Sequence, residues 1–360
     1  MSTFSVQSGD NQLPIDILNK IADPSLSHLI GNLLSGFRQI GNTLREASFS
    51  SDKVGTANDF GDEQLDVDVK TDTILFNVLK ASQNVHVASS EENPTEISCA
   101  PSSSSSSSFS SSSSSSSLLS ETSDSNLGYS VAFDPLDGSS IFDANFSVGT
   151  ILGIWPGTTL LNRLGEEQSA SVIAIYGPMV TLALAINSHA SKDGKAHCIQ
   201  LNMHPTGWEY CKNFIISPEA KTFAPGNLRA TADNVDYMAL VQYYIEKKYT
   251  LRYSGGLVPD IYHILVKGQG VLTNASSPKA KAKLRLLYEC APIALIIHAA
   301  GGDSCVCGTE IDEQLDPVSI LKIPTTTLDR RIGVCYGSSQ EVDRFRKYIF
   351  TKKGKENTTP

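Results

Sequence analysis

Apolar residues recur at helical spacing in several stretches of the chain. Between residues 26 and 44 they follow one another at three- or four-residue steps, which predicts a helix beginning at Ser25 with one continuous apolar face. A second helix is predicted from about Asp72, where Ile74, Leu75, Val78 and Leu79 repeat the pattern. Residues 1–24 and 352–360 lack it, so we expect a flexible N-terminal lead and a flexible tail.

Short runs of apolar and β-branched residues predict buried strands between the helices. Strands are expected at residues 85–88, 129–133 and 147–155, and a strand pair at 172–176 and 180–186 is divided by a Gly-Pro turn. After about residue 215 a second half begins, with expected helices at 234–248, 284–300 and 340–350 and expected strands at 258–266 and 332–336. This mixture of helices and strands indicates an α/β fold.

An acidic turn, Asp134-Pro135-Leu136-Asp137-Gly138-Ser139-Ser140, follows the strand predicted at 129–133. The proline fixes its own φ and biases Asp134 toward extended backbone, so the two carboxylates can converge on a hard cation, which prefers oxygen ligands. Gly138 permits a tight turn, and the two serines are expected to open a helix whose free N–H groups attract an anion. A cation site beside a phosphate site predicts phosphoryl chemistry, although an ordinary surface turn has the same composition.

Composition narrows the classes of partner. The 360-residue chain has a formal charge of −9 and a pI near 5.3 without a basic run, which disfavours nucleic acid and anionic membranes as partners. No apolar run approaches the roughly 20 residues that span a bilayer, and the N-terminal residues have neither a secretory nor a transit pattern, so a cytoplasmic location is expected. Seven scattered cysteines indicate reduced thiols, with Cys305-Val-Cys307 as a weaker candidate for a metal clip.

A low-complexity tract interrupts the first half of the chain. Residues 102–117 are all serine except Phe109, so the tract has almost nothing to bury and we expect a disordered insert over about residues 100–125. An inert loop expansion is the simpler interpretation, and a phosphorylation-rich switch or a binding tail is the alternative. The tract lies between Glu92 and Asp134 and should therefore emerge close to the acidic turn.

The stretch Ser-Val-Ala-Phe-Asp-Pro-Leu-Asp-Gly-Ser-Ser at 130–140, continuing to Gly-Ile-Trp-Pro-Gly at 153–157, resembles the fructose-bisphosphatase family and, more closely, its sedoheptulose-1,7-bisphosphatase branch. Further patterns match in family order at 60–65, 90–92, 225–230, 249–253 and 280–289. The resemblance implies a layered α/β sandwich with alternating helix and sheet layers. It also implies a metal- and 1-phosphate-binding half at 25–215 and a sugar- and distal-phosphate-binding half at 216–351.

The resemblance also implies roles for individual residues of the reaction centre. Two or three Mg²⁺ ions, or Mn²⁺ in their place, would be held by the side chains of Glu91, Asp134, Asp137 and Glu289 and the Leu136 carbonyl, with Asp66 near a further ion. Asp72 and Glu92 match the pair that orients and deprotonates the attacking water. Gly138, Ser139 and Ser140 would hold the scissile 1-phosphate.

The resemblance implies that Asn227, Lys283 and Arg285 contact the sugar substrate. It also implies that Arg252 and Tyr253 bind the distal phosphate. Arg252 would come from a neighbouring subunit, which implies a homodimer or homotetramer. Leu228, and either Thr273 or Asn274, stand where the fructose enzymes have tyrosines, which favours a longer sugar and removal of the 1-phosphate of sedoheptulose 1,7-bisphosphate. A fructose 1,6-bisphosphatase, an enzyme acting on both sugars, and an inactive sugar-phosphate-binding regulator are the alternatives.

Overall fold

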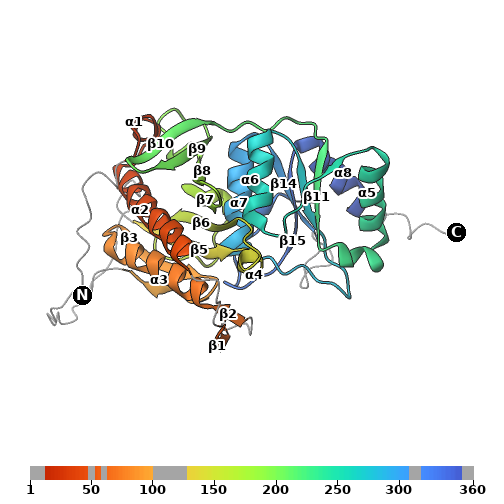
Figure 1. Cartoon of the computed structure of the whole chain (residues 1–360). Coiled ribbons are helices and arrows are strands. Elements are labelled where there is room, and N and C mark those ends of the chain that lie inside the picture. The colour runs from red at the N-terminus through yellow and green to blue at the C-terminus, as the bar shows by residue number, and fades with distance from the viewer. Residues whose placement is uncertain (1–12, 48–52, 58–62, 100–127, 308–317, 351–360) are drawn as a thin grey trace, which may run out of the picture.

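The computed structural model describes residues 13–47, 53–57, 63–99, 128–307 and 318–350. Helices and sheets alternate in five layers, in the order helices, sheet, helices, sheet, helices (Figure 1). Three apolar clusters fill the spaces between these layers. The predicted layered α/β architecture is therefore confirmed. The serine tract and the C-terminal tail lie outside the described residues.

The larger sheet has eight strands in the order β10-β9-β8-β7-β6-β5-β3-β4. All neighbouring pairs are antiparallel except β3 and β5, which are parallel. Because β3 and β5 run side by side in the same direction, the residues that follow them reach the same edge of the sheet. The strands are β3 Val85–Ser90, β4 Ile97–Ser98, β5 Tyr129–Asp137, β6 Val148–Pro156, β7 Ala170–Tyr176, β8 Val180–Ile186, β9 His197–His204 and β10 Gly207–Asn213, and a separate two-stranded ribbon joins β1 Lys53–Ala57 to β2 Glu63–Leu65.

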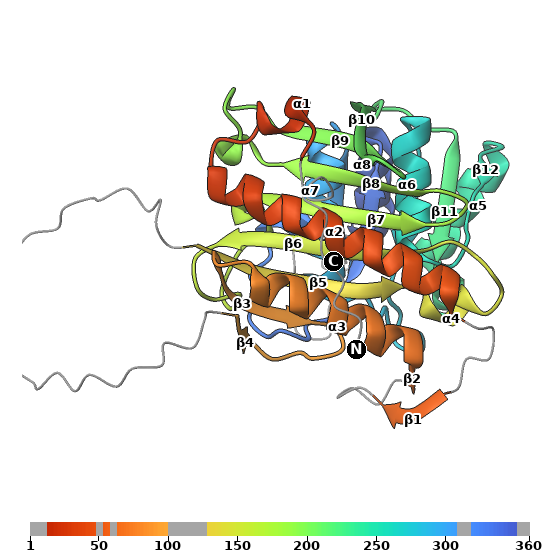
Figure 2. The ribbon, with the colours of Figure 1, turned by 60° about the vertical axis from the view of Figure 1, so that its left-hand side comes forward.

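Helices α2 (Pro24–Glu46) and α3 (Asp66–Ala81) cover one face of this sheet, as Figure 2 shows. The Asp23 side chain accepts a hydrogen bond from the Ser25 backbone N–H at 2.8 Å and so begins α2 within one residue of the predicted start. Helix α3 begins earlier than the predicted Asp72. The expectation of a flexible lead is wrong for the residues described before α2, because the short helix α1 (Ile15–Leu18) buries Ile17 completely against the core.

The middle layer consists of α6 (Leu257–Lys267) and α7 (Ala291–Ala299), which pack between the two sheets. The strand expected at 258–266 is therefore wrong. Its β-branched and aromatic residues fall at helical spacing and face the core on one side of α6. The helix expected from residue 284 begins only at Ala291, because residues 286–290 form a wider π-type turn that brings the Glu289 carboxylate back to the Arg285 N–H at 2.5 Å.

The second sheet has five strands in the order β12-β11-β13-β15-β14. Its outer face is covered by α5 (Val235–Glu246) and α8 (Ser339–Phe350), close to their predicted positions. The strands are β11 Thr222–Gly226, β12 Thr250–Leu251, β13 Val271–Asn274, β14 Asp303–Cys307 and β15 Gly333–Gly337.

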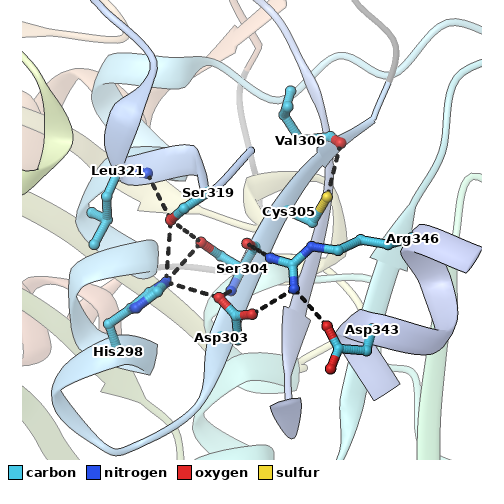
Figure 3. Close-up of polar contacts among 9 residues, drawn as sticks. All are labelled: His298, Asp303, Ser304, Cys305, Val306, Ser319, Leu321, Asp343 and Arg346. Atoms are coloured by element: carbon cyan, nitrogen blue, oxygen red, sulfur yellow. Dashed lines mark hydrogen bonds and ion pairs between the residues drawn. The ribbon is translucent and has the colours of Figure 1, made fainter. Parts of the chain in front are cut away.

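A polar network ties α7, β14 and α8 together (Figure 3). Arg346 of α8 contacts the carboxylates of Asp303 at 2.7 Å and Asp343 at 2.9 Å. The Nε2 atom of His298 lies 3.0 Å from the Ser304 hydroxyl and 3.3 Å from that of Ser319. Ser304 is fully buried, so no substrate can reach this serine and histidine, and we interpret the network as structural.

The cysteines at 305, 307 and 335 lie in the core under α5 and α8, and none of the three is in a disulfide. Cys305 and Cys335 are cross-strand partners on β14 and β15. In the described part of the chain, the only cluster of three potential metal ligands contains no cysteine, so the metal clip suggested by the Cys305 pattern finds no support. No described helix is long and apolar enough to cross a membrane.

Candidate active site

The acidic loop at the end of β5 is held in shape by hydrogen bonds at both sides. The Leu136 N–H donates to the Asp134 carboxylate at 3.0 Å, and the Thr150 hydroxyl donates to the Pro135 carbonyl at 2.8 Å. The pairing with β6 shifts register between residues 134 and 137, which marks a bulge in the strand. Gly138 then turns with φ of +84°, and the predicted helix follows as the short α4 (Ser139–Phe142).

Three carboxylates converge beside this loop. Glu91, Asp134 and Glu289 each offer an oxygen, and these oxygens all lie within 4.8 Å of one another. Glu91 reaches the cluster because β3 runs parallel to β5 and the Glu91 N–H donates to the Phe133 carbonyl at 3.0 Å. Glu289 comes from the π-type turn before α7. Segments distant in the sequence thus deliver acids to one point, as the resemblance implies.

The cluster is electrostatically unfavourable by itself. Burial raises the pKa of Asp134 and of Glu289 well above the usual range, and the neighbouring Glu91 charge raises both further. Buried like charges are accommodated by protonation or by a bound cation. Carboxylate oxygens without thiol or imidazole ligands suit a hard cation such as Mg²⁺. The residues present therefore fit a divalent cation.

Asp137 lies beside this cluster but bonds to a helix. Its two carboxylate oxygens accept the backbone N–H groups of Leu257 at 3.2 Å and Val258 at 2.6 Å, which are the first residues of α6. Burial raises the pKa of Asp137 to about 6, while these two hydrogen bonds oppose the rise. The carboxylate predicted as a metal ligand is thus also the N-terminal partner of a helix in the second half of the chain.

The predicted water-activating pair lies on α3 and directly after Glu91. Burial raises the pKa of Asp72 to about 6, and the nearby Glu92 charge adds to the rise. The Asn93 amide donates to the Asp72 carboxylate at 2.8 Å. Asp68 is also buried, one helical turn before Asp72, and sequence reasoning missed it even though the four-residue spacing places both acids on one face of α3.

Asp66 has a different environment from the other predicted ligands. It forms an ion pair with Lys70, one turn along α3, and its side chain is 50% exposed. It does not belong to the described three-carboxylate cluster. The role suggested for Asp66 near a further ion stays a prediction.

Arg285 and Asn227 make contacts that the sequence did not suggest. Arg285 is buried and forms an ion pair with Glu91, so its guanidinium faces the carboxylates. The Asn227 amide nitrogen donates at 2.8 Å to the carbonyls of both Ala275 and Ala280. Both donors of this amide therefore hold a neighbouring loop in place, and its oxygen is buried without a hydrogen-bond partner among the described residues, so the sugar contact suggested for Asn227 stays a prediction.

The residues expected at the distal phosphate lie on the surface of the second half. Arg252 is exposed after the edge strand β12 and donates to the Leu251 carbonyl at 2.8 Å, while Tyr253 is 50% exposed. Lys283 lines a pocket of about 450 Å³. Thr273, a candidate replacement for a tyrosine, is buried with its hydroxyl 3.1 Å from that of Tyr237.

Comparison with known proteins shows to which protein family the chain belongs. The family model described as fructose-1-6-bisphosphatase, N-terminal domain, matches residues 15–112 and 102–203, and the corresponding C-terminal domain model matches residues 216–350. The chain is 42% identical over 330 residues to the chloroplastic sedoheptulose-1,7-bisphosphatase of Chlamydomonas reinhardtii, covering 91% of this chain and 74% of that protein. It is 31% identical over 349 residues to the class 1 fructose-1,6-bisphosphatase of Geotalea uraniireducens, covering 96% of this chain and 98% of that protein.

Solved structures agree with this assignment. A proposed sedoheptulose-1,7 bisphosphatase from Toxoplasma gondii matches with a TM-score of 0.74 and 33% identity over 92% of this chain and 98% of that chain. The holo form of Leishmania major fructose-1,6-bisphosphatase matches with a TM-score of 0.73 and 25% identity over 90% of this chain and 94% of that chain. The family resemblance noted in the sequence is confirmed, and the chain belongs to the fructose-1,6-bisphosphatase family.

Proposed function

We propose that the chain hydrolyses the 1-phosphate of sedoheptulose 1,7-bisphosphate to give sedoheptulose 7-phosphate and phosphate. The observation that carries this proposal is the cluster of Glu91, Asp134 and Glu289, of which the last two are buried, together with the Gly138–Ser140 turn directly after Asp137. The identity to a protein named as a sedoheptulose-1,7-bisphosphatase supports the seven-carbon substrate.

Different residues of the chain would hold the cation, accept a proton from the attacking water and orient the phosphate. Glu91, Asp134 and Glu289 would hold Mg²⁺, which neutralises the phosphoryl oxygens and lowers the pKa of water when bound. Asp72, with its pKa raised to about 6, is suited to accept a proton from the attacking water near neutral pH. The backbone and hydroxyl groups of Ser139 and Ser140 would orient the phosphate.

A direct test measures phosphate release from sedoheptulose 1,7-bisphosphate and fructose 1,6-bisphosphate with Mg²⁺, with Mn²⁺ and after chelation. We expect metal-dependent turnover, with kcat/KM favouring the seven-carbon sugar by roughly tenfold to a few hundredfold. A preference for the fructose substrate would make the six-carbon alternative correct. Absence of turnover on both sugars with Mg²⁺ or Mn²⁺ would favour the inactive regulator.

We further propose that the protein works in the cytoplasm as a homodimer or homotetramer with Arg252 serving the neighbouring site. The exposed position of Arg252 after an edge strand supports this arrangement. Mixing an Asp134→Asn variant with an Arg252→Gln variant tests it, because hybrid assemblies would contain some sites in which both residues are intact. Recovery of activity on mixing is the expected result, and additive residual activities would contradict it.

A further inference from the structure

A short loop, Ser254-Gly255-Gly256, joins Tyr253 to the start of α6. The Ser254 hydroxyl donates to the Gly256 carbonyl at 3.4 Å and accepts the Gly256 N–H at 3.3 Å. Gly255 has a φ of +102°, in the left-handed region that favours glycine. The 254–256 loop therefore holds a defined shape through its own hydrogen bonds.

The 254–256 loop packs against the proposed phosphate-binding turn. A Cβ atom placed on Gly138 would lie only 3.5 Å from the Gly256 Cα, and one placed on Gly256 would lie 3.4 Å from the side chain of Ile141 on α4. The first residues of α6, directly after the loop, donate their N–H groups to Asp137. The loop thus contacts the phosphate-binding turn at one end and carries Tyr253 at the other.

Asp260, in the first turn of α6, fixes this loop. Its Oδ1 atom accepts the Ser254 backbone N–H at 2.8 Å. Only 6% of Asp260 is exposed, and its Oδ2 atom is buried without a hydrogen-bond partner among the described residues. Burial, and next the charge of Asp260, raises the pKa of the Tyr253 hydroxyl, so the carboxylate lies close to that side chain as well. Burying an unpaired carboxylate oxygen costs free energy, so we interpret Asp260 as a residue that orients the loop rather than one that stabilises the core.

We propose that Asp260 is a positioning residue that sets the distance between the two phosphate-binding ends of the site and thereby contributes to selecting the longer sugar. This inference rests on the proposed function. Asp260 fixes the loop that separates Tyr253, expected at the distal phosphate, from Gly138, expected at the scissile phosphate. A misplacement of about 1 Å can lower a rate about a hundredfold, and one additional carbon lengthens a sugar by about the same distance.

The substitution Asp260→Ala tests this inference through the ratio of two substrates. We expect kcat/KM for sedoheptulose 1,7-bisphosphate to fall roughly tenfold to a hundredfold, mostly through KM, and kcat/KM for fructose 1,6-bisphosphate to fall less. The preference for the seven-carbon sugar should therefore shrink. Asp260→Asn should keep most of the preference, because its amide oxygen can still accept the Ser254 N–H. Asp236→Ala removes an acid from the first turn of α5 and is the matched control, with an unchanged preference.

The substrate ratio separates positioning from a loss of folded protein, because partial unfolding lowers both kcat/KM values by the same factor. Equal losses on the two bisphosphates in Asp260→Ala would overturn the inference. Fructose 1-phosphate has no distal phosphate, so its kcat/KM should stay within about threefold of the wild-type value. A loss on fructose 1-phosphate as large as that on sedoheptulose 1,7-bisphosphate would also contradict a role in spacing the two phosphates.

Calorimetric titration with the two bisphosphates in chelator measures the same preference as a ratio of Kd values, without turnover. We expect the wild type to bind the seven-carbon sugar more tightly and Asp260→Ala to lose most of this difference. An unchanged Kd ratio in the variant would contradict the positioning role. If the Kd ratio changes as expected but the wild type releases no phosphate with Mg²⁺ or Mn²⁺, the proposed function fails and the positioning role of Asp260 stands.

Discussion

Replacing Asp134 by asparagine should have opposite effects on stability in the absence and in the presence of Mg²⁺. Without a cation, the Asp134 carboxylate is buried beside Glu91 and Glu289. Asparagine has nearly the same shape and can still accept the 3.0 Å hydrogen bond from the Leu136 N–H. The substitution therefore removes a charge without opening a cavity.

The magnitude follows from the spacing of the acids. Two unit charges 4.8 Å apart repel by about 3 kcal/mol at an effective dielectric constant of about 20. Partial protonation and the ion pair between Arg285 and Glu91 reduce this repulsion, so we expect the metal-free variant to gain about 2 kcal/mol. For a chain of this size the gain corresponds to a Tm increase of roughly 2–4 °C.

Thermal unfolding followed by circular dichroism, in chelator and in excess Mg²⁺, measures both effects. The wild type should gain about 3 kcal/mol at a Mg²⁺ concentration of 100 Kd, and the variant should lose most of this gain together with activity. The pKa of Asp134 is raised in the folded state, so the carboxylate destabilises the fold increasingly as pH rises through that pKa. The advantage of the variant in chelator should therefore be larger at pH 8 than at pH 5.

The reasoning fails if Asp134→Asn lowers the Tm in chelator, or if Mg²⁺ stabilises the variant as much as the wild type. Asp16→Asn, which changes an exposed acid on α1, is the control and should shift the Tm by less than about 1 °C in either condition.

The loop and the polar network give further predictions. Thr150→Val removes the hydroxyl that donates to the Pro135 carbonyl, and urea unfolding should show a free energy of unfolding lower by about 1–3 kcal/mol. Thr150→Ser keeps the hydroxyl and should retain most of the wild-type stability. Equal losses of stability in the two variants would contradict this role. Arg346→Gln should destabilise by about 1–3 kcal/mol by breaking the ion pair with Asp303 while leaving kcat unchanged, and a large loss of kcat would show that the network reaches the active site. Chelation should abolish phosphate release and added Mg²⁺ should restore it, so full turnover after exhaustive chelation would refute a metal mechanism.

Local patterns predicted most of the elements because each buries one regular face. Helix α2 begins within one residue of its predicted start, since its apolar spacing and its Asp23 cap are both local signals. Helix α6 was misassigned as a strand because Val258, Ile261 and Ile264 favour extended backbone when judged by composition. The carboxylate at its N-terminus comes from Asp137, a partner 120 residues away that no local pattern reveals.

Two acids of the candidate site, Glu91 and Asp134, come shortly after strands that the sequence predicts, whereas Glu289 and the basic residues have no comparable local signal. Glu91 and Asp134 lie at the ends of parallel neighbours, so their convergence follows once β3 and β5 pair. Arg285 gave no such signal, since a solvent-facing and a carboxylate-facing arginine look alike in a sequence. Its direction depends on the π-type turn before α7, which is set by long-range packing.

The bond from Asp137 to α6 means that the halves matched by the two family models are not separable folding units. Helices α6 and α7 cover the face of the eight-stranded sheet that carries Ile151, Trp155 and Ile173, so a fragment ending near residue 215 would leave these side chains uncovered and prone to aggregate. A chimera joined between residues 203 and 216 would combine the eight-stranded sheet of one parent with helices α6 and α7 of the other. Exchange of sequence between relatives at this boundary should therefore succeed only where both parents carry matching residues across the interface.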